Sequence, residues 1–71
     1  MIILGLTFDT HDASATLFID GELVAAAEEE RFVREKHTKK FPEKSILYCL
    51  NKAGCSIENI DYIMVLHLMK M

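Results

Sequence analysis

The chain has 71 residues, of which 51% are hydrophobic, and a net charge of −3 from 11 acidic and 8 basic residues. This length allows at most one small domain, and the acidic balance disfavours a general nucleic-acid-binding protein. No stretch approaches the ~18 apolar residues of a membrane-spanning helix, and no basic residue precedes the leading apolar run as in a signal peptide, so we expect a cytoplasmic protein without nucleic-acid or membrane partners.

Three short apolar runs at the start of the chain predict three β-strands. Residues 2–8 (IILGLTF) are almost wholly apolar, which suits a strand buried on both faces. Residues 14–19 (SATLFI) and 22–27 (ELVAAA) are the second and third candidates. The tract between the first two runs, residues 9–13, is predicted to form an antiparallel turn.

Asp20 and Gly21 separate the second and third apolar runs. An Asp-Gly pair in this position is a strong hairpin signal, because a tight type I′ turn needs positive φ at both central residues. We therefore predict a β-hairpin over residues 14–27.

A charged stretch and a helix follow the hairpin. Residues 28–41 have no clear period and predict an ordered loop with one helical turn. Pro42 and Glu43 favour the first positions of a helix, and Gly54 is typical of its end. The predicted apolar face of this helix consists of Ile46, Leu47, Leu50 and Ala53, which share one side at helical spacing.

After a turn around residues 56–59, residues 61–66 (DYIMVL) predict a fourth strand. The resulting order is β-β-β-α-β, with a fourth strand able to lie beside the first. We therefore predict an α/β protein whose element order resembles the start of a ribonuclease-H-like, actin-like ATPase fold.

A first polar segment, His11-Asp12-Ala13-Ser14 (HDAS), interrupts the apolar frame. A histidine that titrates near neutrality can take a proton from a hydroxyl group, and an adjacent carboxylate can orient it. These residues are therefore candidates for acid–base chemistry. The alternative is that Asp12 and Ser14 only close the turn by hydrogen bonds to the backbone, with His11 exposed.

A second polar segment runs from Glu28 to His37 (EEERFVREKH). Arg31, Arg34 and Lys36 can clamp a phosphate or a group derived from carbamoyl phosphate, because guanidinium forks match such oxyanions. The alternative is a solvated charged face with helical ion pairs, each worth only about 0.2–0.5 kcal/mol. In that case His37 is an exposed residue without a catalytic role.

Metal and disulfide chemistry find little support in the sequence. Cys49 and Cys55 form no CxxC pair, and the three histidines are scattered without zinc spacing. We expect no metal site in this chain and two reduced, half-buried thiols; a disulfide is the alternative.

Together these motifs resemble the opening of the NodU/CmcH carbamoyltransferases. That family typically shows an ILGI-like strand, an HD(S/A)(A/S)A turn, a DG hairpin, AAxEERFxRxKH, and FP before a helix. This chain has each feature in the same order, as ILGL, HDASA, DG, AAEEERFVREKH and FP. The resemblance runs from Ile2 to about residue 65.

The resemblance implies a large enzyme that makes a carbamoyladenylate from ATP and carbamoyl phosphate and transfers the carbamoyl group to a hydroxyl of a small-molecule acceptor. By resemblance, His11 matches the histidine that deprotonates or orients this hydroxyl, with Asp12 in support. The residues that match the charged lining of the site are Arg31, Arg34, Lys36 and His37. The family's divalent-metal ligands, in an H-H-x-x-H run, are absent from this chain.

We therefore expect residues 1–71 to be a truncated, partial N-terminal domain that needs the missing remainder of its domain for activity, with an atypical tail at residues 66–71. The competing hypothesis is a non-enzymatic remnant whose exposed sheet binds a partner or self-associates. RNA binding through residues 31–40 is disfavoured, because Phe32 is its one aromatic residue for stacking before Phe41.

Overall fold

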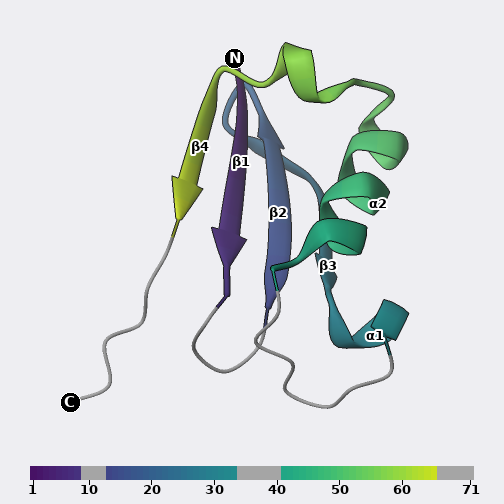
Figure 1. Ribbon diagram of the computed structural model, residues 1–71. Helices are drawn as coiled ribbons and strands as arrows, with labels where there is room; N and C mark the ends of the chain where they lie inside the picture. Colours follow the sequence, from purple (N-terminus) through teal and green to yellow (C-terminus); the bar gives the residue numbers. More distant parts are fainter. Residues whose placement is uncertain (9–12, 34–40, 66–71) are drawn as a thin grey trace, which may run out of the picture.

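A four-stranded mixed sheet forms the frame of the protein in the computed structural model, which describes residues 1–8, 13–33 and 41–65. The strands are β1 (Ile2–Thr7), β2 (Ser14–Ile19), β3 (Glu22–Glu28) and β4 (Tyr62–Val65), in the order β3-β2-β1-β4. β2 is antiparallel to β1 and β3, whereas β4 is parallel to β1 (Figure 1). The α/β class and the place of the fourth strand beside the first are confirmed.

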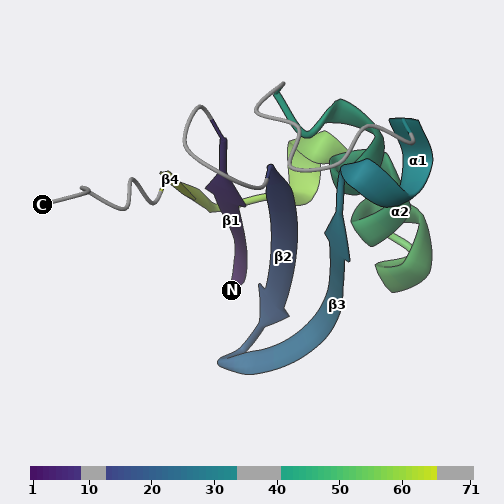
Figure 2. The same cartoon turned by 90° about the horizontal axis from the view of Figure 1, so that it is seen from below.

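The hairpin between β2 and β3 forms at the predicted turn. Asp20 and Gly21 have φ values of 51° and 84°, so both adopt the positive φ that a type I′ turn requires. A shift of the pairing register between Leu17 and Phe18 marks a β-bulge. β3 is strongly curved, as Figure 2 shows.

Two helices and a short 3₁₀ turn lie between β3 and β4. α1 (Glu30–Val33) is a single turn, and α2 (Glu43–Ala53) is the main helix. Gly54 ends α2 in the left-handed conformation at φ 72°, as predicted. The 3₁₀ turn η1 (Ile57–Asn59) then leads toward β4.

The core lies between α2 and one face of the sheet. In β1, Leu4 and Leu6 are buried, whereas their neighbours Ile3 and Gly5 are only partly buried. The prediction that this strand is buried on both faces is therefore wrong for the described part of the chain, because α2 covers one face alone. The buried core cluster comprises Leu4, Leu6, Ala15, Leu17, Ala25, Ile46, Cys49 and Leu50.

The buried face of α2 includes Ile46 and Leu50 as predicted, but it differs from the predicted face at Leu47. Leu47 is 59% exposed, whereas Ser45 and Cys49 are fully buried. The helix is thus rotated so that Ser45 and Cys49, one turn apart, face β2 and β3. Both cysteines are free thiols; Cys55 is partly buried as predicted, and Cys49 is buried more deeply than predicted.

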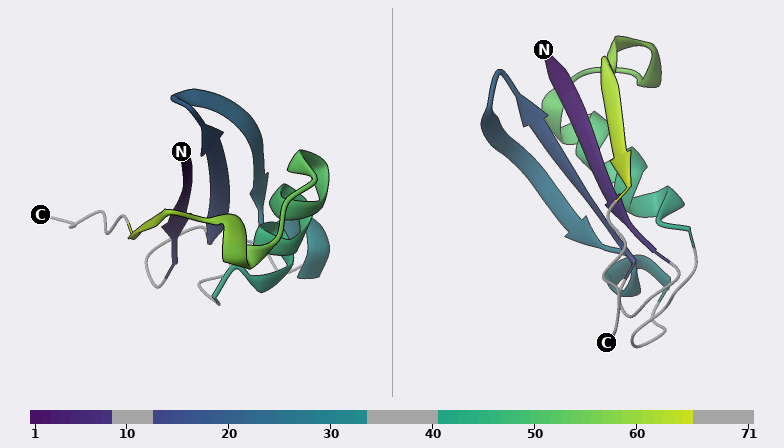
Figure 3. Two further views of the ribbon diagram at one scale, coloured as in Figure 1. Left: turned by 90° about the horizontal axis from the view of Figure 1, so that it is seen from above. Right: turned by 90° about the vertical axis from the view of Figure 1, so that its left-hand side faces the viewer.

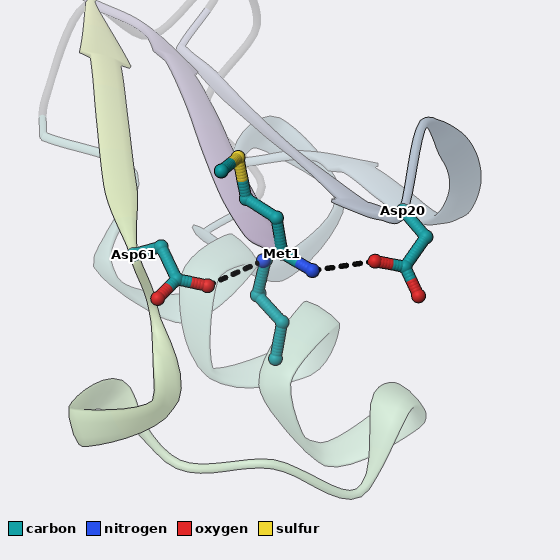
Figure 4. A network of polar contacts seen from close by, with 4 residues as sticks. Met1, Asp20 and Asp61 are labelled. Carbon is teal, nitrogen blue, oxygen red and sulfur yellow. Dashed lines mark hydrogen bonds and ion pairs between the residues drawn. The ribbon is translucent and has the colours of Figure 1, made fainter.

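Polar contacts around Met1 hold the start of β1 in place (Figure 4). The Asp20 carboxylate accepts a hydrogen bond from the α-amino group of Met1, and the Asp61 carboxylate accepts one from the Ile2 N–H at 2.8 Å. β1 is thereby joined to the β2–β3 turn and to the segment that enters β4. No helix in the three described ranges is long and apolar enough to cross a membrane.

Candidate functional site

The two polar segments of the sequence meet at one end of the sheet. Ser14, from the HDAS segment, pairs with Glu28, the first residue of the charged segment, in the β2–β3 ladder. The Glu29 N–H also donates a hydrogen bond to the Ala13 carbonyl at 2.8 Å. Figure 1 shows α1 at this same end of the sheet, beyond β3.

An open hollow of about 310 Å³ lies between these segments. Because side chains alternate across a strand, Ser14, Thr16, Ala26 and Glu28 lie on the face opposite the buried core. The small side chain of Ala26 leaves room between the polar groups. The full lining comprises Ser14, Ala15, Thr16, Ala26, Ala27, Glu28 and Arg31.

Arg31 reaches the hollow from α1, whose orientation is fixed by the neighbouring Phe32. The Phe32 ring lies against the Tyr48 ring of α2, with 5.8 Å between centroids. The Phe32 and Val33 N–H groups donate to the Glu29 carbonyl at 2.9 and 3.1 Å and begin the turn. The aromatic contact therefore holds α1 against α2 and leaves Arg31 exposed beside the hollow.

The polar groups of the hollow suit a small ligand that carries both an oxyanion and hydroxyl groups. Arg31 supplies a planar set of donors for an oxyanion, and Glu28 supplies acceptors for hydroxyls. The hydroxyl groups of Ser14 and Thr7 are hydrogen-bonded to each other at 2.7 Å. Among the described residues, no group of three or more His, Cys, Asp or Glu side chains is placed to hold a metal ion.

Of the predicted site residues, Arg31 is the one that the structure describes, and it lines the hollow together with Ser14. The other predicted site residues lie outside the described residues: His11, Asp12, Arg34, Lys36 and His37. The structure thus brings the described parts of both polar segments together, and the roles of the individual side chains stay predictions.

Sequence reasoning missed Glu29, which is buried with an exposed fraction of 3%. The alternative of a solvated charged face is therefore wrong for this residue. A signal for it exists in the sequence, since Pro42 precedes α2 and has no side-chain acceptor for the first N–H groups of the helix. These N–H groups are then open to an acceptor from elsewhere in the chain, and Glu29 supplies it.

Comparison with known proteins decides the family. The family model described as carbamoyltransferase N-terminus matches residues 2–70. The chain belongs to the carbamoyltransferase N-terminus family. The resemblance inferred from the motifs is therefore confirmed, and both polar segments of the chain lie within the match.

Three relatives show how far the similarity extends along longer proteins. An uncharacterised protein of Synechocystis sp. is 51% identical over 61 residues, which are 86% of this chain and 10% of that protein. Nodulation protein NolNO of Sinorhizobium fredii is 51% identical over 53 residues, 75% of this chain and 8% of that protein. An uncharacterised protein of Methanocaldococcus jannaschii is 44% identical over 64 residues, 90% of this chain and 12% of that protein. The chain thus spans about a tenth of the length of these relatives.

Proposed function

We propose that this chain is the N-terminal part of a carbamoyltransferase that transfers a carbamoyl group from a carbamoyladenylate to a hydroxyl of a small-molecule acceptor. ATP and carbamoyl phosphate are the precursors of the carbamoyladenylate in this proposal. Family membership supports the reaction class. The observation that carries the assignment of the site is the hollow, where Ser14 of one polar segment and Arg31 of the other lie together.

The proposed transfer step uses residues of both segments. His11 removes the proton of the acceptor hydroxyl, and Asp12 orients His11 for this step. The hydroxyl oxygen then forms a bond to the carbamoyl carbon, and the bond from that carbon to the AMP phosphate oxygen breaks, so AMP leaves with the electron pair. Arg31, Arg34, Lys36 and His37 are proposed to stabilise the negative charge of the leaving phosphate.

The larger frame of the proposal is an actin-like domain completed by further chain. The mixed sheet with β4 parallel to β1 supports this fold, because it matches the element order from which the fold was predicted. The divalent metal of the full-length enzyme would need ligands from that further chain, and no step above depends on it. The isolated 71-residue chain is proposed to bind ligand without completing the transfer.

Titration of the isolated chain with carbamoyl phosphate, followed by NMR, tests the site. The signals of Ser14, Thr16 and Arg31 are expected to shift together, and Arg31→Ala is expected to abolish these shifts. Glu22→Ala is the matched control, since Glu22 is an exposed charge at the other end of β3. Shifts confined to residues away from the hollow would contradict the proposal.

The catalytic role of His11 needs a chain that completes the reaction. We would place residues 2–70 in a full-length member of the family, in place of the segment that the same family model matches, and assay carbamoyl transfer and pyrophosphate release separately. His11→Ala is expected to collapse transfer while pyrophosphate release from ATP continues. An equal loss of both steps would refute the role assigned to His11.

A second candidate function, self-association, is favoured by a separate surface. An apolar groove of about 360 Å³ lies beside α2, and its rim residues Leu47, Ile57 and Ile63 are each more than half exposed. Exposed apolar patches of this kind mark interaction sites. In the first proposal the remainder of the domain covers this groove, and in the second a further copy of the chain does.

Sedimentation velocity at several concentrations distinguishes these two occupants. A second copy predicts a concentration-dependent dimer that Leu47→Glu dissociates, with Leu23→Glu, on the opposite edge strand, as control. A monomer at every concentration would rule out self-association and leave the groove to the remainder of the domain.

A further inference from the structure

Glu29 is a buried carboxylate that links three parts of the chain around the hollow. Its exposed fraction is 3%, and it lies between Glu28 and Arg31, both of which line the hollow. Strand alternation explains why the neighbours differ: the Glu28 side chain faces the hollow, and the Glu29 side chain faces α2 on the other side of the sheet.

The Glu29 carboxylate binds the first turn of α2. Its Oε1 accepts hydrogen bonds from the Ser45 N–H at 2.9 Å and the Ser45 hydroxyl at 2.8 Å, and its Oε2 accepts one from the Lys44 N–H at 3.3 Å. Pro42 offers no side-chain cap, so this carboxylate satisfies donors that the helix leaves open. A negative charge at this end also interacts favourably with the helix dipole.

The backbone of the same residue holds both sides of the hollow. The Glu29 N–H donates to the Ala13 carbonyl at 2.8 Å, directly before Ser14. The Glu29 carbonyl accepts from Phe32 and Val33 and so starts the turn that carries Arg31. A change in the side-chain anchor therefore alters the relative positions of Ser14 and Arg31.

We propose that Glu29 is the positioning residue of the candidate site, holding Ser14 and Arg31 at the separation that ligand binding requires through its carboxylate anchor on α2. This inference rests on the proposed function for the ligand that the hollow binds. The anchor itself is a property of the described residues and can be tested without ligand.

The first test compares carbamoyl phosphate affinity among folded variants of the 71-residue chain. Glu29→Ala is expected to weaken binding about tenfold, because the donors on α2 lose their acceptor and the anchor is released. Glu29→Gln keeps an acceptor oxygen and is expected to bind within about threefold of wild type. The control is Ile46→Val, a mild truncation of a buried α2 residue outside the hollow, which is expected to lower stability modestly and leave affinity unchanged.

Two outcomes of this titration would overturn the inference. Glu29→Ala binding like wild type would reduce Glu29 to a purely structural cap. Equal weakening by Glu29→Ala and Ile46→Val would trace the effect to general stability.

Amide hydrogen exchange gives the second, ligand-free test. Ser45→Ala removes a donor on the far side of the sheet, and it is expected to speed exchange selectively at the amides of Glu29, Phe32 and Val33. Ile46→Val is expected to speed exchange in proportion across the sheet. If Ser45→Ala behaves in the same uniform way, no coupling exists and the inference fails. If wild type binds no carbamoyl phosphate, the proposed function fails, and the exchange rates still decide the role of Glu29.

Discussion

The two halves of the sheet differ in how they are covered. α2 packs on β2 and β3, and β4 lies at the edge far from this helix (Figure 3). Ala15 and Leu17 of β2 are fully buried, whereas every residue of β4 is exposed. The core spans β1 to β3, since it includes Leu4 and Leu6 of β1, and the candidate site lies on β2 and β3. The β4 strand at the other edge presents apolar side chains that call for a further layer.

The two edge strands of the sheet, β3 and β4, also differ in how readily they would pair with another strand. β3 carries a bulge and the charged residues Glu22 and Glu28, features that discourage pairing with another strand. β4 (Tyr62–Val65) has no charged residue. Among the described residues no strand pairs with the outer edge of β4, and an apolar strand in that position accepts a further strand readily. This agrees with a chain that spans about a tenth of the length of the three relatives described above.

The largest expected difference between the halves is in the stability lost when a large apolar side chain is truncated to alanine. Leu17→Ala is expected to cost about 2–5 kcal/mol, because Leu17 is fully buried under α2. A domain of this size has only about 3–5 kcal/mol in total, so the variant should be largely unfolded. Ile63→Ala, at a side chain 55% exposed, is expected to cost less than about 1 kcal/mol.

Urea denaturation of both variants at micromolar concentration measures this contrast. Leu23→Ala, at a residue 61% exposed on β3, serves as a matched surface control. A loss at Ile63 comparable to that at Leu17 would show that β4 is covered in solution, as in a self-associated chain.

Cys55 should react with a thiol reagent about tenfold or more faster than Cys49, the ratio that corresponds to a free-energy difference of about 1.4 kcal/mol. Cys49 is fully buried in the covered half, its Sγ lies 3.6 Å from the Ala15 carbonyl, and burial raises the pKa of its thiol. Cys55 is partly exposed. Iodoacetamide followed by mass spectrometry should therefore modify Cys55 first.

Reaction of the two thiols in 8 M urea provides the unfolded reference, in which the difference should vanish. Equal rates without urea would mean that α2 does not stay packed on β2. The test thus reports directly on whether α2 covers β2 in solution.

Local signals in the sequence predicted most of the fold. Asp20-Gly21 located the hairpin because its backbone demand is specific, and Pro42 and Gly54 bracketed α2 to within a residue. Each of these signals acts within a few residues, so no knowledge of distant packing is needed. The strands were found within one or two residues at each end for the same reason.

Long-range packing accounts for what the sequence did not predict. Helical spacing placed Leu47 on the inner face, but α2 lies over β2 and β3 with Ser45 and Cys49 inward. Ser45 is tolerated there because Glu29, sixteen residues earlier, accepts its hydrogen bonds. The family motifs predicted that the two polar segments share one site, but Ser14 was not among the predicted site residues, since spacing alone does not show which strand ends meet.

A substitution at Gly54, where the chain leaves α2 toward β4, is expected to have an effect of intermediate size on folding stability. Gly54→Ala is expected to cost about 1 kcal/mol, because a side chain at φ 72° strains the backbone. An added Cβ there meets no atom within 4 Å, so the loss is conformational alone. Gly5→Ala is the control: its Cβ would lie 3.9 Å from the Thr16 carbonyl oxygen, an ordinary contact, and the urea midpoint should stay the same or rise. Equal losses at the two glycines would contradict this account.

The smallest expected effect is a pH dependence at Met1, whose contacts reach both halves. The hydrogen bond to Asp20 and, to a lesser extent, the negative charges of Asp20 and Asp61 raise the pKa of the α-amino group above its ordinary value of 8.0. A group with a raised pKa stabilises the fold fully below the unfolded-state value, and this contribution is lost as the pH rises through the folded-state value. The midpoint temperatures of thermal unfolding for wild type and Asp20→Asn should therefore differ slightly at pH 7 and converge by pH 10. The contributions of groups that titrate in both proteins cancel in this difference. A gap that stays constant from pH 7 to pH 10 would show that Asp20 acts through the β2–β3 turn, and that the amino group contributes nothing to holding β1 between the two halves.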